Sequence, residues 1–254
     1  MRTRAKSFRI FTVAIALAVA VVVVKQILHI LNLELVAQSS LHNAAISSAI
    51  FVLGFILSAT IADYKESERI PSDFSTNIED MYNDAVEIHK TYPVFDLDGF
   101  RVQLRKIAQG FGRDARKKSY DARLTIRDLG PYYTEMERGG VPANFIVKLK
   151  QQQVLLLRAR QRVDYIQRIK FVPSATILAR SIVIMVIVLL LFTNVDPFYG
   201  GLAIVGIISF VLIYMLILIK VISTPFHDAG ATRDDVSLFL IKDAVEYLSK
   251  KSPK

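Results

Sequence analysis

The chain has 254 residues, of which 52% are hydrophobic and 22% charged, and its formal net charge is +9. It contains no cysteine, which excludes disulfides, thiolate metal sites and cysteine nucleophiles. The mean hydropathy of +0.37 is high for so charged a chain. Apolar residues form long blocks near both ends, and most of the charge lies between them. This segregation is typical of an integral membrane protein.

Four apolar segments are long enough to cross a membrane, because a spanning helix needs about 20 mostly apolar residues. These segments are 10–33, 41–62, 173–193 and 198–219. Lys25 interrupts the first segment, and we expect its side chain to extend toward the outer headgroups. A basic leader and a short apolar run also describe a signal peptide, but the cleavage candidate Ala37 lies too far beyond the run. The first segment is therefore predicted to be a retained signal-anchor helix.

The distribution of basic residues predicts the orientation, because lysine and arginine collect on the cytoplasmic side of a membrane. Four basic residues precede the first segment, whereas 34–42 and 194–197 contain none. Most of the others lie in 63–171 and after Ile219. We therefore expect the N-terminus, the central region and the C-terminus to be cytoplasmic.

The expected fold class is an all-α integral membrane protein with four transmembrane helices and a helical cytoplasmic domain inserted between helices 2 and 3. The N-terminal transmembrane hairpin would occupy 1–62, and the cytoplasmic domain 63–172. The C-terminal hairpin would occupy 173–220, followed by a cytoplasmic helix and tail in 221–254. No strand is predicted.

Helical spacing recurs through the first half of the cytoplasmic region. A helix capped by Ser72 after Pro71 is expected to end at Pro93, and the next to begin at Asp96 or Asp98. A third helix would cover 114–129 and stop before Gly130 and Pro131. The core faces of the first two are Phe74, Ile78, Met81, Ala85, Ile88, Phe100, Leu104, Ile107 and Phe111.

A longer helix is expected from Pro142 to Phe171, leading through Pro173 into the third span. Its core face is predicted to contain Phe145, Leu149, Leu156, Ala159, Val163 and Ile166. A final amphipathic helix would be capped by Thr232 or Asp234. Its apolar residues are Val236, Phe239, Leu240, Val245 and Leu248.

No enzyme active site is predicted. The sequence around Gly110 and Gly112 lacks the lysine and the flanking strand of a phosphate-binding loop. The carboxylates of Asp96 and Asp98 fit helix caps better than a catalytic pair. No serine has a histidine neighbour in a nucleophile motif.

No metal or cofactor is expected either, although His29, Glu34 and His42 would lie near one outer surface, because nothing in their spacing brings them together. A basic cluster in the central region is interleaved with aspartates, which favours a solvated helix face. Contact with anionic lipid is the alternative, and nucleic acid is not expected. The cluster comprises Arg113, Arg116, Lys117, Lys118, Arg123 and Arg127.

One face of the second span combines polar, small and bulky apolar residues at helical spacing. They are Asn43, Ser47, Ile50, Phe51, Gly54, Ser58 and Ile61. Such a face fits a water path with a hydrophobic constriction. Close helix packing through Gly54 and Ser58 is the alternative interpretation.

Arg180 lies about two turns inside the third span, where an arginine is costly and marks a candidate functional site. Extension of its side chain toward the cytoplasmic interface is one interpretation. Attraction of ions, or pairing with another helix, is the other.

Several short segments lie at the membrane boundaries of the predicted spans. Arg158, Arg160 and Arg162 approach Pro173 at the head of the third span. The run from Ala62 to Glu68 leaves the second span, and Pro225 and Phe226 follow the fourth. In these segments the chain resembles the bestrophin-like membrane proteins, a prokaryotic family related in topology to the bestrophin channels. The chain departs from that pattern in having no tryptophan early in the third span and no acidic cluster like a calcium clasp.

The resemblance implies a homo-oligomer around a central axis that conducts small inorganic ions across the cytoplasmic membrane of a prokaryote, with the second span lining the pore. The seven residues on its face would then line the pore, and Asp63, Lys65 and Glu66 would lie at its inner mouth. The alternative function is a non-conducting, membrane-anchored scaffold or sensor whose helical domain binds a cytoplasmic partner.

Overall fold

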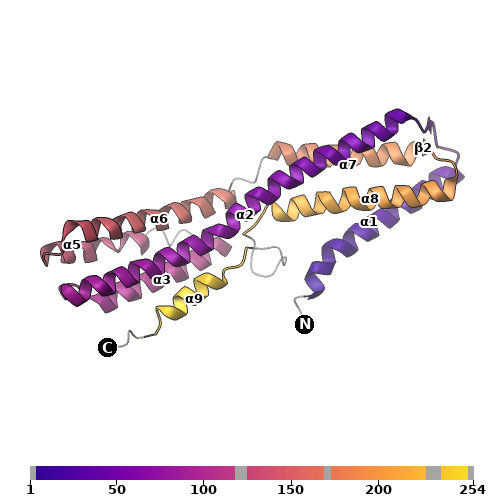
Figure 1. The fold of residues 1–254 in the computed structure, drawn as a ribbon. Helices are drawn as coiled ribbons and strands as arrows, with labels where there is room; N and C mark the ends of the chain where they lie inside the picture. Colours follow the sequence, from indigo (N-terminus) through magenta and orange to yellow (C-terminus); the bar gives the residue numbers. More distant parts are fainter. Residues whose placement is uncertain (1–3, 118–124, 169–172, 227–235, 251–254) are drawn as a thin grey trace. The chain divides into compact units, whose positions relative to one another are not determined.

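The computed structural model describes residues 4–117, 125–168, 173–226 and 236–250 (Figure 1). Contacts divide the chain into two compact units. The first contains α1, α2 as far as Tyr64, α7 and α8. The second contains the rest of α2 from Lys65, together with α3, α5, α6 and α9.

The first unit is built from helices α1 (Arg4–Ile30), α2 (Ser40–Thr91), α7 (Pro173–Phe192) and α8 (Phe198–Ile222). Each is long and apolar enough to cross a membrane. The prediction of an all-α protein with four apolar candidate spans is thus confirmed. Little of each apolar segment is buried within the protein, which is what a lipid or subunit environment requires.

Helix α1 ends three residues before the predicted boundary at Leu33 because Asn32 adopts the left-handed conformation, with φ of 53°. The amide of Asn32 donates to the carbonyl of His29, and that of Leu33 to the carbonyl of Leu28, each at 3.0 Å. These two bonds form a Schellman motif, which satisfies the last carbonyls of the helix.

Two short strands were not predicted. Strand β1 (Val36–Ala37) follows α1, β2 (Thr193–Asn194) follows α7, and the two pair in parallel. Val36 is opposite Thr193 and Ala37 is opposite Asn194. Strands of two residues carry no periodic signal in the sequence, so hydropathy alone predicted loops here.

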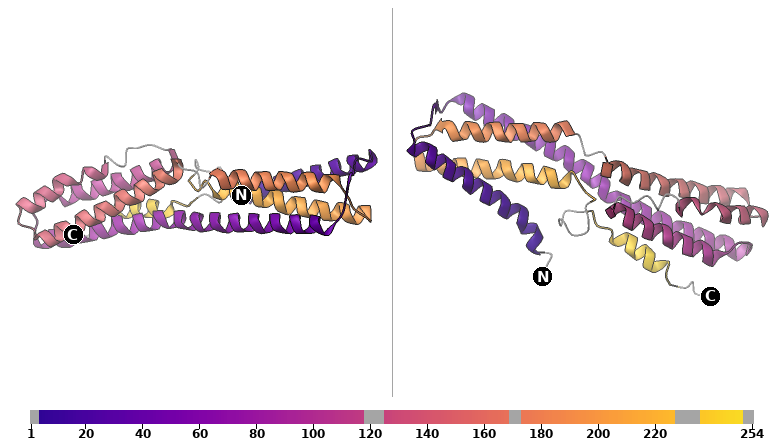
Figure 2. Two further views of the ribbon diagram at one scale, coloured as in Figure 1. Left: turned by 90° about the horizontal axis from the view of Figure 1, so that it is seen from above. Right: turned by 180° about the vertical axis from the view of Figure 1, so that it is seen from behind.

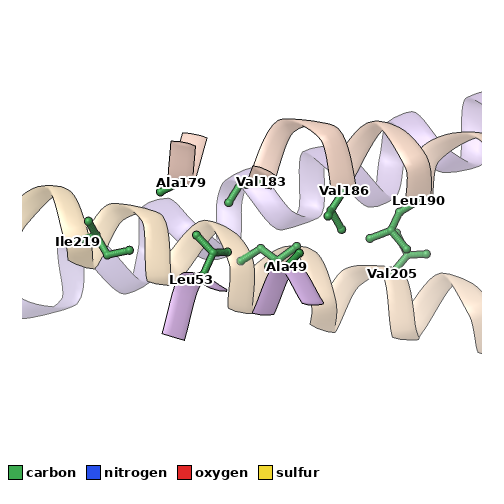
Figure 3. Packing of buried hydrophobic residues seen from close by; sticks show 9 residues of the cluster. Ala49, Leu53, Ala179, Val183, Val186, Leu190, Val205 and Ile219 are labelled. Atoms are coloured by element: carbon green, nitrogen blue, oxygen red, sulfur yellow. The ribbon is translucent and has the colours of Figure 1, made fainter. Parts of the chain in front are cut away.

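The core of the first unit joins α2, α7 and α8 (Figure 3). Small and branched apolar side chains fill it, so the helices can approach closely. Its fully buried members are Ala49, Leu53, Ala179, Val183, Val186, Leu190, Val205, Leu212 and Ile219.

The second unit consists of the remainder of α2, α3 (Leu97–Lys117), α5 (Gly130–Arg138), α6 (Ala143–Arg168) and α9 (Phe239–Tyr247), which Figure 2 shows from two directions. The core face predicted for its first two helices is confirmed. All nine residues are buried, and the rings of Phe74 and Phe111 stack with centroids 3.9 Å apart.

The predicted helix start at Ser72 is wrong, because α2 continues through Pro71 as one helix of 52 residues. Proline removes one backbone hydrogen bond and disfavours a helix interior. Pro71 is buried, however, and Ile70 and Phe74 beside it extend the apolar face without interruption. Tertiary packing outweighs the local preference of one residue. The predicted end of this helix before Pro93 is confirmed at Thr91.

Asp96 rather than Asp98 caps α3, since its Oδ1 accepts a hydrogen bond of 2.9 Å from the amide of Gly99. The predicted helix start at Asp114 is wrong, because α3 continues to Lys117. Most of the rest of that prediction lies outside the described residues. Helix α5 begins at Gly130, where a stop was expected, and Pro131 occupies its first turn.

The core face predicted for α6 is confirmed at Leu149, Leu156, Val163 and Ile166. The prediction that Phe145 belongs to this core face is wrong, because its side chain is 41% exposed and Ile146 is buried instead. In α9 the buried residues are Ile241 and Ala244, whereas Phe239 is 56% exposed. The predicted caps of α9 and the link from α6 into α7 fall outside the described residues.

Candidate functional site

The polar and small face of α2 points away from the other helices of its own unit. Asn43, Ser47 and Ser58 are exposed, and Gly54 is half-buried. Ile50 and Ile61 are also exposed, and Phe51 is 75% exposed. No side-chain hydrogen bond within the described part of the chain involves the asparagine or either serine. This face is therefore available to water, lipid or another subunit.

The opposite face of α2 holds the helix in place. Ala49 and Leu53 are buried in the core shared with α7 and α8. Figure 3 shows both side chains among the helices of this core. Thr60 is also buried, and its hydroxyl donates to the carbonyl of Ile56 at 2.7 Å. The apolar packing thus fixes which side of α2 faces outward.

Gly54 and Ser58 do not mediate packing inside the protomer. A Cβ atom added to Gly54 would meet no atom within 4 Å, and Ser58 is exposed. If this small pair packs against another helix, that helix belongs to another molecule.

Sequence reasoning missed Phe55, which is 71% exposed one turn after Phe51 on the outward side of α2. The four-residue spacing of two phenylalanines places them one above the other on a helix. That spacing could have revealed the pair, but Phe55 lies at the edge of the polar stripe. Two exposed rings at successive levels therefore place aromatic bulk on this side of α2.

Arg180 on α7 is exposed, whereas the adjacent Ala179 is completely buried in the core. Within the described ranges, Arg180 has no ion pair. Its side chain therefore points away from the helices of its own unit, and pairing with a helix of the same chain finds no support.

The three charged residues predicted at the inner mouth lie along the middle of α2. Asp63 is half-buried, and Lys65 is exposed. Glu66 accepts hydrogen bonds from Arg162 Nε at 3.1 Å and Nη2 at 2.8 Å. Both nitrogens donate to the same oxygen, Oε1, and this ion pair joins α2 to α6 within the second unit.

The prediction that Lys25 extends to the headgroups is wrong. Its side chain is 1% exposed, and its Nζ lies 2.5 Å from Glu34 Oε1. The same ammonium group donates to the carbonyls of Leu191, at 3.2 Å, and Thr193. A lysine near the last carbonyls of α7 is favoured by the helix dipole. The carboxylate and the two carbonyls thus provide the hydrogen-bond acceptors that water would otherwise offer to the ammonium group.

Glu34 also joins His29, whose Nδ1 lies 2.8 Å from Glu34 Oε2 and whose ring stacks on Phe198 at 3.6 Å. Burial opposes ionisation of Glu34, but hydrogen bonds and charges from Lys25 and His29 outweigh burial and lower its pKa. His42 instead contacts Ser39 Oγ at 3.0 Å. Across the described residues, no three histidine or acidic side chains converge as metal ligands.

The three arginines that carry the family resemblance have different surroundings. Arg158 is exposed, and Arg162 binds Glu66. Arg160 is 4% exposed, and its Nε donates to Asp114 Oδ2 at 2.9 Å. A buried charge of this kind needs its partner, so Arg160 has a structural role between α6 and α3.

No protein-family model and no curated protein sequence matches this chain. Solved structures do. A variant of a bacterial bestrophin homolog from Klebsiella pneumoniae superposes with a TM-score of 0.80 at 13% identity, over 94% of this chain and 97% of that chain. A second variant gives 0.81 at 13% identity, over 96% and 98%. A third gives 0.73 at 15% identity, over 95% and 96%. Over nearly its whole length, the chain therefore has a bestrophin-like fold.

Proposed function

We propose that this chain is the subunit of a homo-oligomeric channel for small inorganic ions, with α2 lining the pore. The observation that carries the proposal is the outward face of α2. Asn43, Ser47 and Ser58 are exposed on a helix whose opposite face is packed. Polar side chains facing hydrocarbon are unfavourable, so this face belongs next to water or another subunit.

An oligomer follows from the same observation. One α2 helix cannot enclose a water path, but several copies around an axis can. Phe51 and Phe55 would then form two apolar rings that gate by excluding water. The bestrophin-like fold supports this arrangement, since the similar structures are described as bestrophin homologs.

The proposed topology places the N-terminus, the second unit and the C-terminus in the cytoplasm of a prokaryotic cell. Loop charges support it, because no lysine or arginine occurs in 34–42 or 194–197. Accessibility of an engineered cysteine at Lys106 to an impermeant reagent on intact cells tests the topology. Labelling from outside would contradict it.

Recording from purified protein in planar bilayers tests the function. We expect single-channel currents from the unmodified protein and larger currents from Phe51→Ala and Phe55→Ala, because each removes bulk from the constriction. Ile207→Ala on α8 is the matched control, since Ile207 is 65% exposed but lies on another helix. Its current should equal that of the unmodified protein.

Silent bilayers together with a monomeric mass in detergent would reject the channel and favour the scaffold. Equal currents from the phenylalanine variants and the unmodified protein would reject the constriction.

A further inference from the structure

Two exposed faces of the second unit carry opposite charges at the same seven-residue spacing. On α2, Asp73 and Asp80 are exposed. On α3, Lys106 and Arg113 are exposed. Residues seven apart lie on nearly the same side of a helix, two turns from one another. Each pair therefore forms a short charged stripe parallel to its helix.

The stacked rings of Phe74 and Phe111 show how the two stripes are aligned. Because a short connection joins α2 to α3, the helices run antiparallel. Asp80 then lies about 9 Å from the stack toward the end of α2, and Lys106 about 7.5 Å in the same direction. Asp73 and Arg113 both lie on the other side of the stack, within about 3 Å of it. Asp80 and Lys106 therefore lie at about the same height along the helix axes, and so do Asp73 and Arg113.

The two stripes lie outside the core that α2 and α3 share. Phe74, Ile78, Leu104, Ile107 and Phe111 are buried, and the stacked rings of Phe74 and Phe111 join these faces of the two helices. Helix α9 covers other positions: the hydroxyl of Ser75 donates to the carbonyl of Leu240 at 2.9 Å, and Gly112 lies beside Ile241. Both stripes remain open to solvent.

Most of these charges have no ion-pair partner in the part of the chain that the structure describes. Among the described residues, Asp80, Lys106 and Arg113 form no ion pair. Asp73 pairs with Arg69 at 3.3 Å, but both side chains are more than half exposed. Such exposed pairs contribute little stability and exchange easily.

We infer that the α2 stripe of one subunit binds the α3 stripe of the next, pairing Asp80 with Lys106 and Asp73 with Arg113. The partner that binds each stripe is a second copy of this chain, because opposite charges lie at the same heights on the two stripes. The contact joins two different surfaces, and repetition of such a contact closes a ring when the rotation between neighbours divides a full turn. The inference rests on the proposed homo-oligomer and specifies which surfaces build it.

Cross-linking tests the contact directly, because the natural chain has no cysteine. In the purified full-length protein, the double variant Asp80→Cys/Lys106→Cys should form a ladder of dimers and larger species on oxidation. Either single variant should stay monomeric on a denaturing gel. In the proposed contact an α2 stripe meets an α3 stripe, so two identical cysteines never lie side by side. Asp80→Cys/Lys150→Cys is the matched control, with an exposed lysine on α6, and should give no ladder.

A double variant that remains monomeric would overturn the inference. Dimers from either single variant would also overturn it, because identical faces would then be in contact.

Charge reversal provides an independent measurement of the same pair. Asp80→Lys and Lys106→Asp should each lower the ratio of oligomer to monomer about five-fold at low salt. The combined variant should restore the ratio. Failure of that restoration contradicts the pairing. So does an Arg113→Glu variant that leaves the oligomer intact but loses binding to vesicles containing anionic lipid.

The outcomes separate this inference from the channel. A cross-linked ring that passes no current would reject the channel and keep the contact. Currents from an oligomer that the cysteine pair never cross-links would reject the contact and keep the channel.

Discussion

The ammonium group of Lys25 lies 2.5 Å from a carboxylate oxygen of Glu34, and neither side chain is more than 6% exposed. The lysine comes from a candidate membrane span and the glutamate from the loop after it. Their contact explains how an apolar helix accommodates a positive charge without exposing it. Several expectations follow from this pair and from the other polar contacts.

Glu34→Gln should lower thermal stability strongly, because it leaves a buried ammonium group without its counter-charge. Loss of one partner of a buried ion pair costs about 3–5 kcal/mol. Thermal unfolding of the detergent-purified protein measures the effect. Lys25→Met/Glu34→Gln removes both charges and should recover most of the loss. If Glu34→Gln alone melts like the unmodified protein, the ammonium group of Lys25 does not depend on Glu34 as its counter-charge.

Stability should fall in acid through Glu34. Its pKa in the folded protein is lowered by Lys25 and His29 against the effect of burial. A lowered pKa contributes stability above the unfolded value of about 4.3, and this contribution disappears as the pH falls through the folded pKa. Melting temperatures between pH 7 and pH 3 should show a smaller acid-induced loss for Glu34→Gln. Parallel curves for both proteins would contradict this assignment.

Gly54→Val should reduce conductance without disturbing the fold of the protomer. A Cβ atom at Gly54 meets nothing within 4 Å, so the added side chain has space and would project from the outward face of α2. The melting temperature and the oligomer mass should stay within error while single-channel current falls. Loss of the oligomer instead would favour the packing interpretation of Gly54 and Ser58.

Arg160→Met and Arg162→Met should differ in stability although they lie two residues apart. The first removes the buried guanidinium group that binds Asp114, whose side chain is 1% exposed, and should cost about 3–5 kcal/mol. The second removes a pair in which both partners are exposed and should cost about 1 kcal/mol or less. Thermal unfolding of the two full-length variants provides the comparison. Equal losses would show that burial does not distinguish them.

Arg180→Gln should leave conductance and subunit number unchanged, because Arg180 is exposed and we expect its side chain to reach the cytoplasmic headgroups. Reconstitution of the variant into bilayers checks this. A shift in the ratio of cation to anion current would instead give the arginine a role in attracting ions.

Hydropathy predicted the four spans because twenty apolar residues in sequence have few other stable environments. It could not predict that α2 would pass through Pro71, since the burial of Ile70 and Phe74 depends on partners distant in the chain. Phe145 was misplaced for a related reason: a helical stripe can shift by one residue with little change in pattern. Ile146 fits the core of α6 equally well on sequence alone.

The surroundings of Lys25 were also beyond prediction. Two of its acceptors are backbone carbonyls, one in α7 and one in β2, and a carbonyl has no signature in the sequence. The outward face of α2 was easier to find, because polar residues within an apolar span are visible by type. The role of that face stays a prediction, since one protomer cannot enclose a pathway.

The pairing of Val36 with Thr193 has a consequence for motion. Together with Ala37 and Asn194, it links the turn of the first hairpin to that of the second through main-chain bonds. Such a clasp does not depend on side-chain identity. We expect the helices attached to it to move like rods hinged at a common end, with displacements that grow with distance from the paired strands. Amide exchange in α7 should then become faster from Phe192 toward Pro173, and uniform exchange along α7 would rule out such a hinge.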